Sequence, residues 1–270
     1  MKNFKKIIFI FLIAICFTAC KEKKKNPNEV VLGTIAGPET ELAEVAKQVA
    51  KNKHNIDIII KAFNDYQEPN RALDEGVLDA NMFQHEPFLR KSMSDHGYDF
   101  TILAKTFVYP MGLYSEKYKN IKDIPNESVV AIPNDPSNAA RALILLENAG
   151  LISLDRDRRV NDIISLTIKD IKSNPKKLKI KEMDAAGIPR ILPDVALAAI
   201  NTNYAILADK LPSRDAIFLE DENSVYANII VINSKDIDKE SLKKLKESVQ
   251  SKEVLEKAKK IFKDQAIKAY

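Results

Sequence analysis

The sequence predicts an α/β protein of two lobes, each built on a mixed sheet and joined to the other by a hinge. Short apolar runs rich in Val and Ile alternate with longer segments whose apolar residues recur at helical spacing. This alternation occurs twice, before and after two extended segments at 100–108 and 111–114. Strands that alternate with helices of these lengths favour a parallel or mixed sheet covered on both faces, so we expect two such sheets.

The first half opens with a strand at 30–35, a turn at 37–38 and a helix from Glu39 onward, whose apolar residues lie three and four positions apart. The other elements expected here are a strand at 56–62, a short helix at 69–75, a short strand at 78–83 and a helix at 86–96 that Gly97 ends.

The second half begins after a loop at 119–128, with a strand at 129–132 and a helix that starts at Pro136 and is closed by Gly150. The elements expected next are a strand at 178–183, a region at 185–200 that continues as an extended segment to 203–204, strands at 216–219 and 226–232, and two amphipathic helices from 239 to the end. We expect residues 30–107 with 235–270 to form lobe 1, and residues 108–234 to form lobe 2. Two α/β halves joined in this way are typical of bilobed proteins that close on a ligand at the lobe interface.

Residues 1–19 have the form of a secretory signal peptide. Three lysines precede an unbroken apolar run at 7–17, which is too short to span a bilayer. The run ends in Phe17-Thr18-Ala19-Cys20, which resembles the lipobox of bacterial lipoproteins, where the cysteine receives acyl chains such as palmitate and becomes the first mature residue. Phe17 departs from the usual Leu, and a plain signal peptide with a coincidental cysteine is the alternative.

The cysteines and the distribution of charge limit which disulfides and which binding partners are possible. Cys16 lies in the removed segment, so Cys20 is left as a single cysteine and no internal disulfide can form. Residues 20–29 read as a short charged, lipidated tether. Removing the signal lowers the formal net charge from +4 to +1. The tether holds four Lys and two Glu, a net charge of +2, so the folded body has a net charge of −1. We find no basic and aromatic interleaving, so no nucleic acid partner is expected.

Residues 129–143 combine a buried strand, a polar loop and an apolar helix. Asp135 can cap this helix, and Asn138 and Arg141 are three positions apart on its first turns, beside backbone N–H groups that attract anions. The pattern suits the binding of a carboxylate. An ordinary capped helix with a surface Arg is the alternative.

Catalytic motifs are missing from the sequence. The three histidines, His54, His85 and His96, do not lie at metal-ligand spacing with another His, Cys or acid. There is no Gly-x-Ser-x-Gly, no phosphate-binding glycine loop and no nucleophilic cysteine. We therefore expect no enzyme activity, no metal and no cofactor.

Several segments together resemble one family. They are 63–70 (FNDYQEPN), 78–85 (LDANMFQH), 109–115 (YPMGLYS), 132–143 (IPNDPSNAARAL), 173–176 (SNPK) and 225–228 (VYAN). They look like the methionine-binding lipoproteins of the NLPA lipoprotein family, the receptors of a methionine importer of the ATP-binding-cassette (ABC) class. The resemblance runs from about residue 30 to the C-terminus. Ala139 and Ala140 stand where the family usually has glycines.

The resemblance implies a type II periplasmic-binding-protein fold with a cleft for a free amino acid. Arg141 would pair with the ligand carboxylate in a two-pronged contact, helped by Asn138 and the helix start. Asn228 matches an asparagine of the family's ligand site. Asn203 would supply a further amide, but Asn201 would share its face of an extended segment, and the sequence does not decide between them.

Tyr66, Phe83 and Tyr109 would form the apolar walls, where a thioether packs well against aromatic edges, and His85 would lie at the rim. Each has a structural alternative. Phe83 could be an ordinary core residue, and His85 a satisfied structural histidine. The two tyrosines could serve only the loop or hinge in which they lie. Asn138 could be an ordinary polar residue of a first helical turn, and the other three asparagines could be turn residues.

The expected function is that of a monomeric receptor, exported and anchored by the lipid on Cys20 to a bacterial membrane, at its periplasmic face or at the cell surface. It would bind L-methionine or a close analogue and deliver it to the permease and ATPase subunits of an ABC importer. The alternatives are the same fold with another amino acid or a methionine-containing dipeptide, a surface lipoprotein with an adhesin role, and an enzyme.

Overall fold

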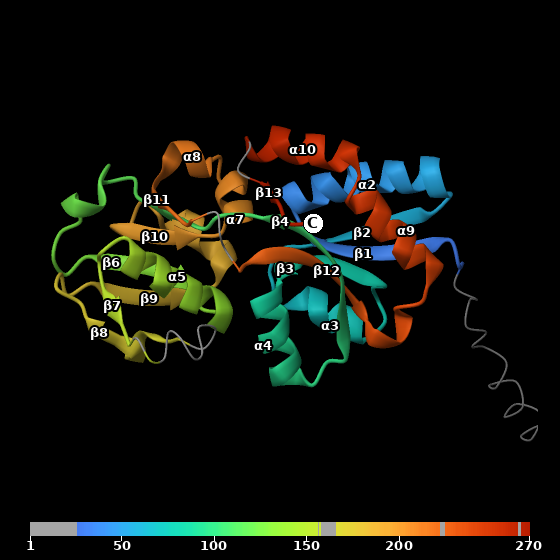
Figure 1. Cartoon of the computed structure of the whole chain (residues 1–270). Helices are drawn as coiled ribbons and strands as arrows, with labels where there is room; N and C mark the ends of the chain where they lie inside the picture. The colour runs from blue at the N-terminus through green and yellow to red at the C-terminus, as the bar shows by residue number, and fades with distance from the viewer. Residues whose placement is uncertain (1–25, 156, 158–165, 222–224, 264–265) are drawn as a thin grey trace, which may run out of the picture.

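Two mixed sheets, one in each lobe, organise the protein (Figure 1). The computed structural model describes residues 26–155, 157, 166–221, 225–263 and 266–270. The larger sheet has the strand order β13-β4-β12-β3-β1-β2, and the smaller has the order β11-β5-β10-β6-β9. The expected α/β architecture of two mixed-sheet lobes is confirmed. The predicted signal peptide and Cys20 lie outside the described residues.

The larger sheet belongs to lobe 1, where β1 runs parallel to β2 and β3, and β12 runs antiparallel to β3 and β4. Its strands are β1 (Glu29–Ile35), β2 (Asp57–Phe63), β3 (Ala80–His85), β4 (Phe100–Val108), β12 (Ala227–Asn233) and β13 (Ile267–Lys268). The helices of this lobe are α2 (Pro38–His54), α3 (Glu68–Asp74), α4 (Glu86–His96), α9 (Glu240–Val249) and α10 (Lys252–Phe262).

Both faces of this sheet are covered, as β12 shows. Ile230 and Ile232 pack with α2, α9 and α10, whereas Ile229 and Val231 pack with α3 and α4. Figure 1 shows these two groups of helices on opposite sides of the sheet. Because successive residues of a strand point to opposite faces, a run that is apolar on both faces belongs at the centre of a covered sheet.

The smaller sheet belongs to lobe 2. Its strands are β5 (Gly112–Tyr114), β6 (Val129–Pro133), β9 (Lys179–Met183), β10 (Leu197–Ile200) and β11 (Ala216–Leu219), and its α-helices are α5 (Pro136–Asn148), α7 (Thr202–Leu207) and α8 (Pro212–Asp215). A small antiparallel pair, β7 (Ser153–Leu154) with β8 (Ile171–Ser173), lies apart from the sheet. The 3₁₀ segment Ala185–Ile191 covers the face opposite α5, together with α7.

Three sequence predictions were wrong in detail. The boundary of lobe 2 at 234 is corrected, because β12 pairs with β3 and β4 and so belongs to lobe 1. The chain therefore returns from lobe 2 to lobe 1 between the end of β11 and the start of β12. Residues 203–204 lie in α7 and not in an extended segment. The C-terminus is not helical to its end, since β13 adds to the edge of the larger sheet beside β4.

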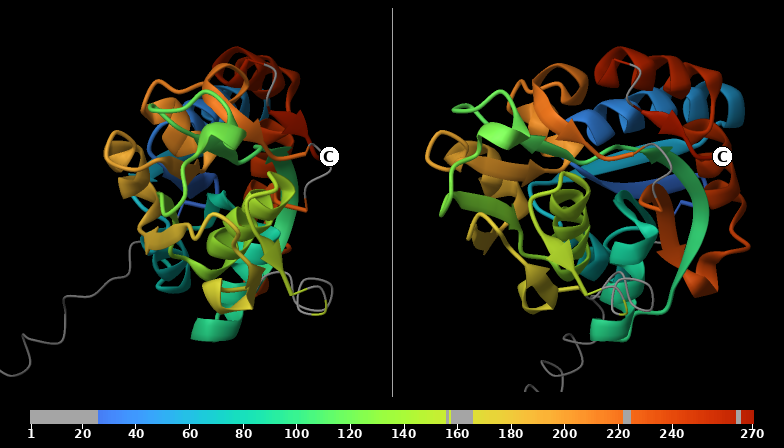
Figure 2. Two further views of the ribbon diagram at one scale, coloured as in Figure 1. Left: turned by 90° about the vertical axis from the view of Figure 1, so that its left-hand side faces the viewer. Right: turned by 60° about the vertical axis from the view of Figure 1, so that its left-hand side comes forward.

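The lobes touch across their interface. Oη of Tyr66 in lobe 1 donates to Oδ1 of Asn203 in lobe 2 at 2.7 Å. Apolar residues of both lobes, among them Ile35 and Phe83 of lobe 1 and Tyr204 and Ala205 of lobe 2, form one buried cluster. Figure 1 and the right-hand view of Figure 2 show the two lobes packed side by side. This is a conformation in which side chains of both lobes meet.

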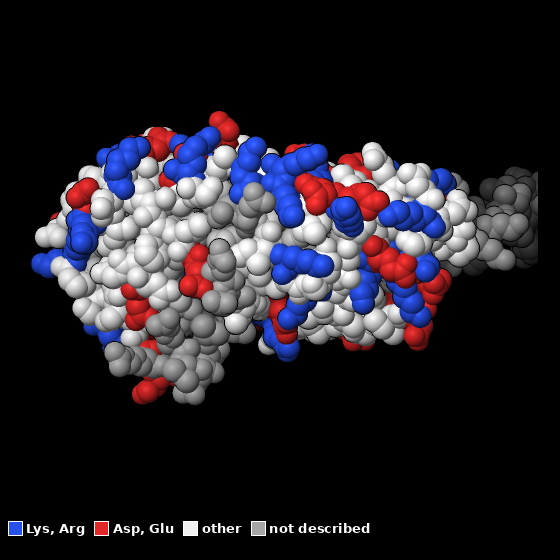
Figure 3. Space-filling view, turned by 45° about the horizontal axis from the view of Figure 1, so that its top comes forward, with Lys and Arg blue, Asp and Glu red and all other residues white. Residues whose placement is uncertain are grey.

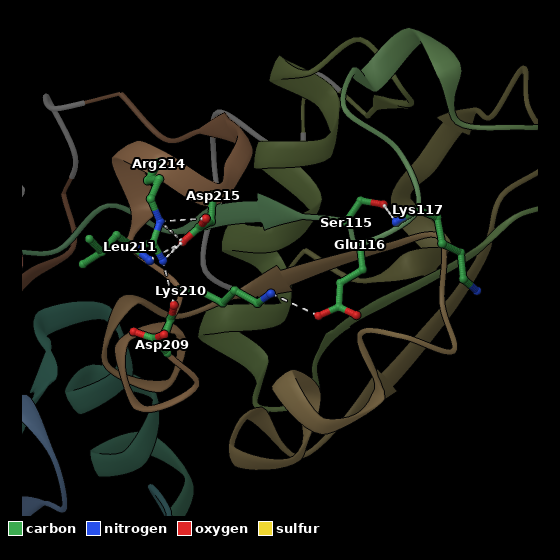
Figure 4. A network of polar contacts seen from close by, with 8 residues as sticks. All are labelled: Ser115, Glu116, Lys117, Asp209, Lys210, Leu211, Arg214 and Asp215. Atoms are coloured by element: carbon green, nitrogen blue, oxygen red, sulfur yellow. Dashed lines mark hydrogen bonds and ion pairs between the residues drawn. The ribbon is translucent and has the colours of Figure 1, made fainter.

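Charges of both signs share the outer surface. On the face shown in Figure 3, Lys and Arg side chains lie among Asp and Glu side chains. In lobe 2, Nζ of Lys210 lies 3.0 Å from Oε1 of Glu116, and Nη2 of Arg214 lies 2.7 Å from Oδ2 of Asp215 (Figure 4). Such solvent-exposed pairs contribute about 0–1 kcal/mol each. Within the described part of the chain, no helix is both long and apolar enough to span a membrane.

Candidate ligand-binding site

One cavity between the lobes is lined by every ligand-site residue that the sequence predicts. These residues are Tyr66, Phe83, His85, Tyr109, Asn138, Arg141, Asn201, Asn203 and Asn228. The structure adds Glu39, Gln84, Phe88 and Thr202 to the walls. About 380 Å³ in the cavity and at its opening to solvent is not filled by atoms, and only a small part of it is wide enough for the centre of a water molecule. The walls therefore lie close together, as in a closed cleft.

The start of α5 is a capped turn. Oδ1 of Asp135 accepts from N of Asn138 at 3.0 Å, and Pro136 occupies the first helical position, where a missing N–H costs nothing. Nδ2 of Asn138 also donates to both carboxylate oxygens of Asp135, at 2.9 and 3.0 Å. A carboxylate of the protein itself thus accepts from the backbone N–H of Asn138. Fewer free N–H groups at this helix start remain for a ligand than the sequence suggests.

Asn138 joins the two lobes. Its Oδ1 accepts from Nδ2 of Asn201 at 2.8 Å and lies 3.3 Å from Nε2 of His85, which is in lobe 1. Nδ1 of His85 accepts from N of Phe88 at 3.1 Å, so the ring proton belongs on Nε2, and this nitrogen donates to Asn138. The start of α5 therefore faces the other lobe. All the polar atoms of the Asn138 side chain are used within the protein.

Burial, followed by the positive charge of Arg141, lowers the pKa of His85 from its usual 6.5 to about 3. The unfolded chain binds a proton at this residue below about pH 6.5, and the folded chain does not until about pH 3. The free energy of unfolding therefore falls as the pH falls through this window, by up to about 1.4 kcal/mol per pH unit.

We predict that His85→Gln reduces the loss of stability between about pH 7 and pH 5 by about 2 kcal/mol relative to the wild type. Urea unfolding at the two pH values measures it. The matched control is His96→Gln, which changes an exposed histidine at the end of α4 and should leave the loss unchanged. Equal losses in the wild type and in His85→Gln would contradict the assignment of a buried, neutral imidazole.

Arg141 is buried and paired within the protein. It is 4% exposed, and nine of the thirteen residues of α5 are buried, which excludes the alternative of a surface Arg. Nε donates to Oε1 of Glu220 at 2.9 Å, and Nη2 donates to Oε2 of Glu220 and, at 2.9 Å, to the carbonyl oxygen of Tyr109. The guanidinium lies over the ring of Tyr226, 4.3 Å from its centroid.

Glu220 therefore makes the two-pronged contact that the sequence analysis expected of a ligand carboxylate. A guanidinium has five N–H donors. Glu220 and Tyr109 accept three hydrogen bonds from Nε and Nη2, and none of these contacts uses Nη1. Glu220 therefore fixes the plane of the Arg141 side chain without using all of its donors.

Three polar atoms of the cavity walls are buried without a hydrogen-bond partner among the described residues. They are Oδ1 of Asn201, Nδ2 of Asn203 and Oε2 of Glu39. An unsatisfied buried polar atom costs about 1–3 kcal/mol, and a ligand that supplies the missing partner recovers this cost. One free donor and two free acceptors in a single cavity suit a ligand that carries both an anionic and a cationic group.

Aromatic rings form the apolar side of the cavity. The centroid of Tyr66 lies 6.0 Å from those of Phe83 and Phe88 and 5.0 Å from that of Tyr204. Phe83 and Phe88 meet edge to face at 5.8 Å. This wall suits an unbranched apolar side chain or a thioether.

Two of the predicted residues also have structural contacts elsewhere. The ring of Tyr109 stacks on Phe262 of α10 at 4.4 Å, so this residue contributes to the core of lobe 1 as well as to the cavity. Nδ2 of Asn228 donates to the carbonyl oxygen of Phe83 at 3.3 Å, which ties β12 to β3. Tyr109 and Asn228 therefore both make structural contacts and line the cavity.

Six residues of the cavity or of the Arg141 contacts were not singled out from the sequence: Glu39, Gln84, Phe88, Thr202, Glu220 and Tyr226. Tyr226 lies in the VYAN segment, but only Asn228 was taken from it. In the sequence, Glu39 is an ordinary acid of a first helical turn and Glu220 an ordinary acid after a strand. The burial of Glu39 and the pairing of Glu220 with Arg141 distinguish them only in the folded chain. Among the described residues, no cluster of three or more His, Cys, Asp or Glu could hold a metal ion.

A cavity enclosed by two lobes, with aromatic walls, a buried Arg and unsatisfied polar atoms of both kinds, defines a bilobed solute-binding protein. The chain belongs to the NlpA lipoprotein family, whose family model matches residues 30–270. The family predicted from the sequence is therefore confirmed.

The relatives agree with this assignment. The D-methionine-binding lipoprotein MetQ of Salmonella typhi is 44% identical over 261 residues, which cover 95% of this chain and 94% of the relative. A periplasmic substrate-binding protein of an ABC transporter from Coxiella burnetii is 52% identical, with a TM-score of 0.85 over 89% of this chain and all of its own. A nutrient-binding protein from Burkholderia cenocepacia, solved with bound methionine, is 46% identical, with a TM-score of 0.87 over the same shares. The fold is that of the periplasmic substrate-binding proteins.

Proposed function

We propose that this chain is a lipid-anchored receptor that binds methionine between its lobes and delivers it to the permease and ATPase of an ABC importer. The observation that carries the proposal is the set of unsatisfied polar atoms on residues that line one aromatic cavity, which Arg141 also lines. The relatives named for methionine binding and ABC transport support it. The protein acts as a carrier and not as an enzyme.

The ligand carboxylate accepts hydrogen bonds from Arg141 and from Nδ2 of Asn203, and the ammonium group donates to Oδ1 of Asn201. This assignment gives both asparagines a role, which removes the choice between them. Tyr66, Phe83 and Phe88 surround the thioether. Asn138, His85 and Asn228 hold the walls in place through their contacts within the protein.

Magnitudes show why the polar contacts matter. Burial of a methionine side chain yields about 2–3 kcal/mol, whereas a nanomolar complex requires about 12 kcal/mol. The aromatic walls therefore cannot suffice, and charge-assisted hydrogen bonds in a closed cavity supply much of the remainder.

The anchoring is part of the same proposal. Residues 1–19 direct export, acyl chains on Cys20 hold the protein at the membrane, and residues 20–29 keep the folded body away from the lipid. The receptor acts on the periplasmic face of the membrane or at the cell surface. It acts as a monomer, since one chain supplies both lobes and all the residues that line the cavity.

A ligand panel tests the function. We predict that L-methionine, D-methionine or a methionine dipeptide raises the melting temperature, with a gain in unfolding free energy of about RT ln(1 + [L]/Kd), and that most other amino acids do not. D-methionine belongs in the panel because the Salmonella relative is named for it. A response to none of the compounds would contradict a solute receptor and favour an adhesin role. A response only to another amino acid would show that this amino acid, and not methionine, is the ligand.

A further inference from the structure

Glu39 differs from the other carboxylates near the cavity. Asp135 accepts from Asn138 and Ser137, and Glu220 accepts from Arg141. Glu39 is the second residue of α2, is 3% exposed and lines the cavity, yet its Oε2 has no hydrogen-bond partner among the described residues. An acid in the first turn of a helix is ordinary, but a buried carboxyl group that lines a cavity with one oxygen unpartnered is not.

The surroundings of Glu39 do not supply a positive charge. The titratable groups that its charge acts on are the hydroxyls of Tyr66, Tyr109 and Tyr204, and burial, aided by Glu39, raises the pKa of each above its usual value. Among the described residues that line the cavity, Arg141 is the only Lys or Arg, and Glu220 holds it. His85 is neutral near pH 7.

Burial raises the pKa of the Glu39 carboxyl to about 8, against a smaller opposing effect of a hydrogen bond with its own backbone N–H. Near neutral pH, the site without ligand therefore holds Glu39 mainly as the neutral acid. A cation placed beside the carboxyl group would favour the ionised form.

We propose that Glu39 receives the ammonium group of the ligand and releases its own proton to solvent as the ligand binds. The inference rests on the proposed function and deepens it. The O–H bond of the carboxyl breaks, the proton leaves to buffer, and the resulting carboxylate pairs with the intact ligand ammonium, beside Oδ1 of Asn201. Charge in the cavity is then balanced at both ends of the ligand. A ligand with a carboxylate but no ammonium group leaves Glu39 protonated.

Calorimetry counts the proton directly. Methionine is titrated into the full folded protein at about pH 7 in phosphate and in Tris, whose ionisation enthalpies differ, and the difference in observed binding enthalpy gives the protons released. We expect close to one proton for methionine and none for 4-(methylthio)butanoate, the analogue that lacks the amino group. The methionine Kd should also fall by more than about tenfold between pH 6 and pH 8, and that of the analogue should not.

The substitution Glu39→Gln keeps the size of the side chain and removes its charge. We expect the variant to release no proton when methionine binds. Its Kd for methionine should rise at least about tenfold, and its Kd for the analogue should stay within about twofold of the wild-type value. The matched control is Glu44→Gln, which changes an exposed acid of the same helix that pairs with Lys47 and should behave as wild type.

Methionine binding without proton release in the wild type would overturn the inference and leave the proposed function standing. Failure of methionine to bind at all would overturn the function itself. If Glu39→Gln does not fold, the proton count and the comparison of methionine with its analogue in the wild type decide the matter.

Discussion

Arg141→Ala is expected to lower methionine affinity by at least about 100-fold and to destabilise the protein at the same time. The first effect follows because the variant loses the only Lys or Arg among the described cavity residues, and with it a charge-assisted contact to the ligand carboxylate. The second follows because Glu220, whose side chain is only 13% exposed, loses its charged partner and keeps, among the described residues, only the hydrogen bond from the backbone N–H of Met111. Removing one partner of a buried ion pair costs about 3–5 kcal/mol, and the partial exposure of Glu220 places the expected loss at or below the lower end of this range. Calorimetry and urea unfolding measure the two effects separately.

A second substitution separates binding from folding. Adding Glu220→Gln to Arg141→Ala removes the uncompensated charge, so the double variant should recover much of the lost stability but none of the affinity. Arg214→Ala is the matched control, since this exposed arginine of lobe 2 lies outside the cavity and should change neither quantity appreciably. Near-normal methionine affinity in a folded Arg141→Ala variant would refute the assignment of the carboxylate site.

Asn138→Ala should be the next most damaging change. The substitution leaves the Nε2 proton of His85 and the Nδ2 group of Asn201 without their acceptor, and takes two donors from Asp135. At about 1–3 kcal/mol for each unsatisfied buried group, a total loss of about 3–5 kcal/mol in unfolding free energy is expected. Because Asn138 joins the lobes, methionine affinity should fall as well.

The control for this variant is Asn134→Ala, which changes an exposed asparagine just before the same helix. Its unfolding free energy should lie within about 0.5 kcal/mol of the wild type. If Asn138→Ala matched that control in stability, the hydrogen-bond network at the start of α5 would not have the importance assigned to it.

Local signals in the sequence predicted most of the elements. Gly97 ends α4, Asp135 and Pro136 begin α5, and the apolar run at 226–232 is a strand. These features depend on neighbours within a few positions, so they can be predicted from the sequence directly. The pairing of β12 with β3 and β4 cannot be predicted in this way, because it brings together residues more than a hundred positions apart. The predicted lobe boundary at 234 was wrong for that reason.

The site, like the fold, has features that short motifs predict and features that depend on long-range contacts. The resemblance to the family identified the residues that line the cavity, because that information is carried by short motifs. It did not reveal that Glu220, 79 positions from Arg141, already holds the guanidinium, or that Asp135 occupies the helix start. It also gave no reason to single out Glu39. Pairing and burial are properties of the folded chain, and they decide which cavity atoms remain free for a ligand.

Native mass spectrometry of the purified protein tests the central claim most directly. The account predicts a species heavier by one methionine, either carried through purification or formed when methionine is added, with a 1:1 limit that excess ligand does not exceed. A protein that remains unliganded at millimolar methionine, or that carries a different small molecule which methionine cannot displace, would contradict it.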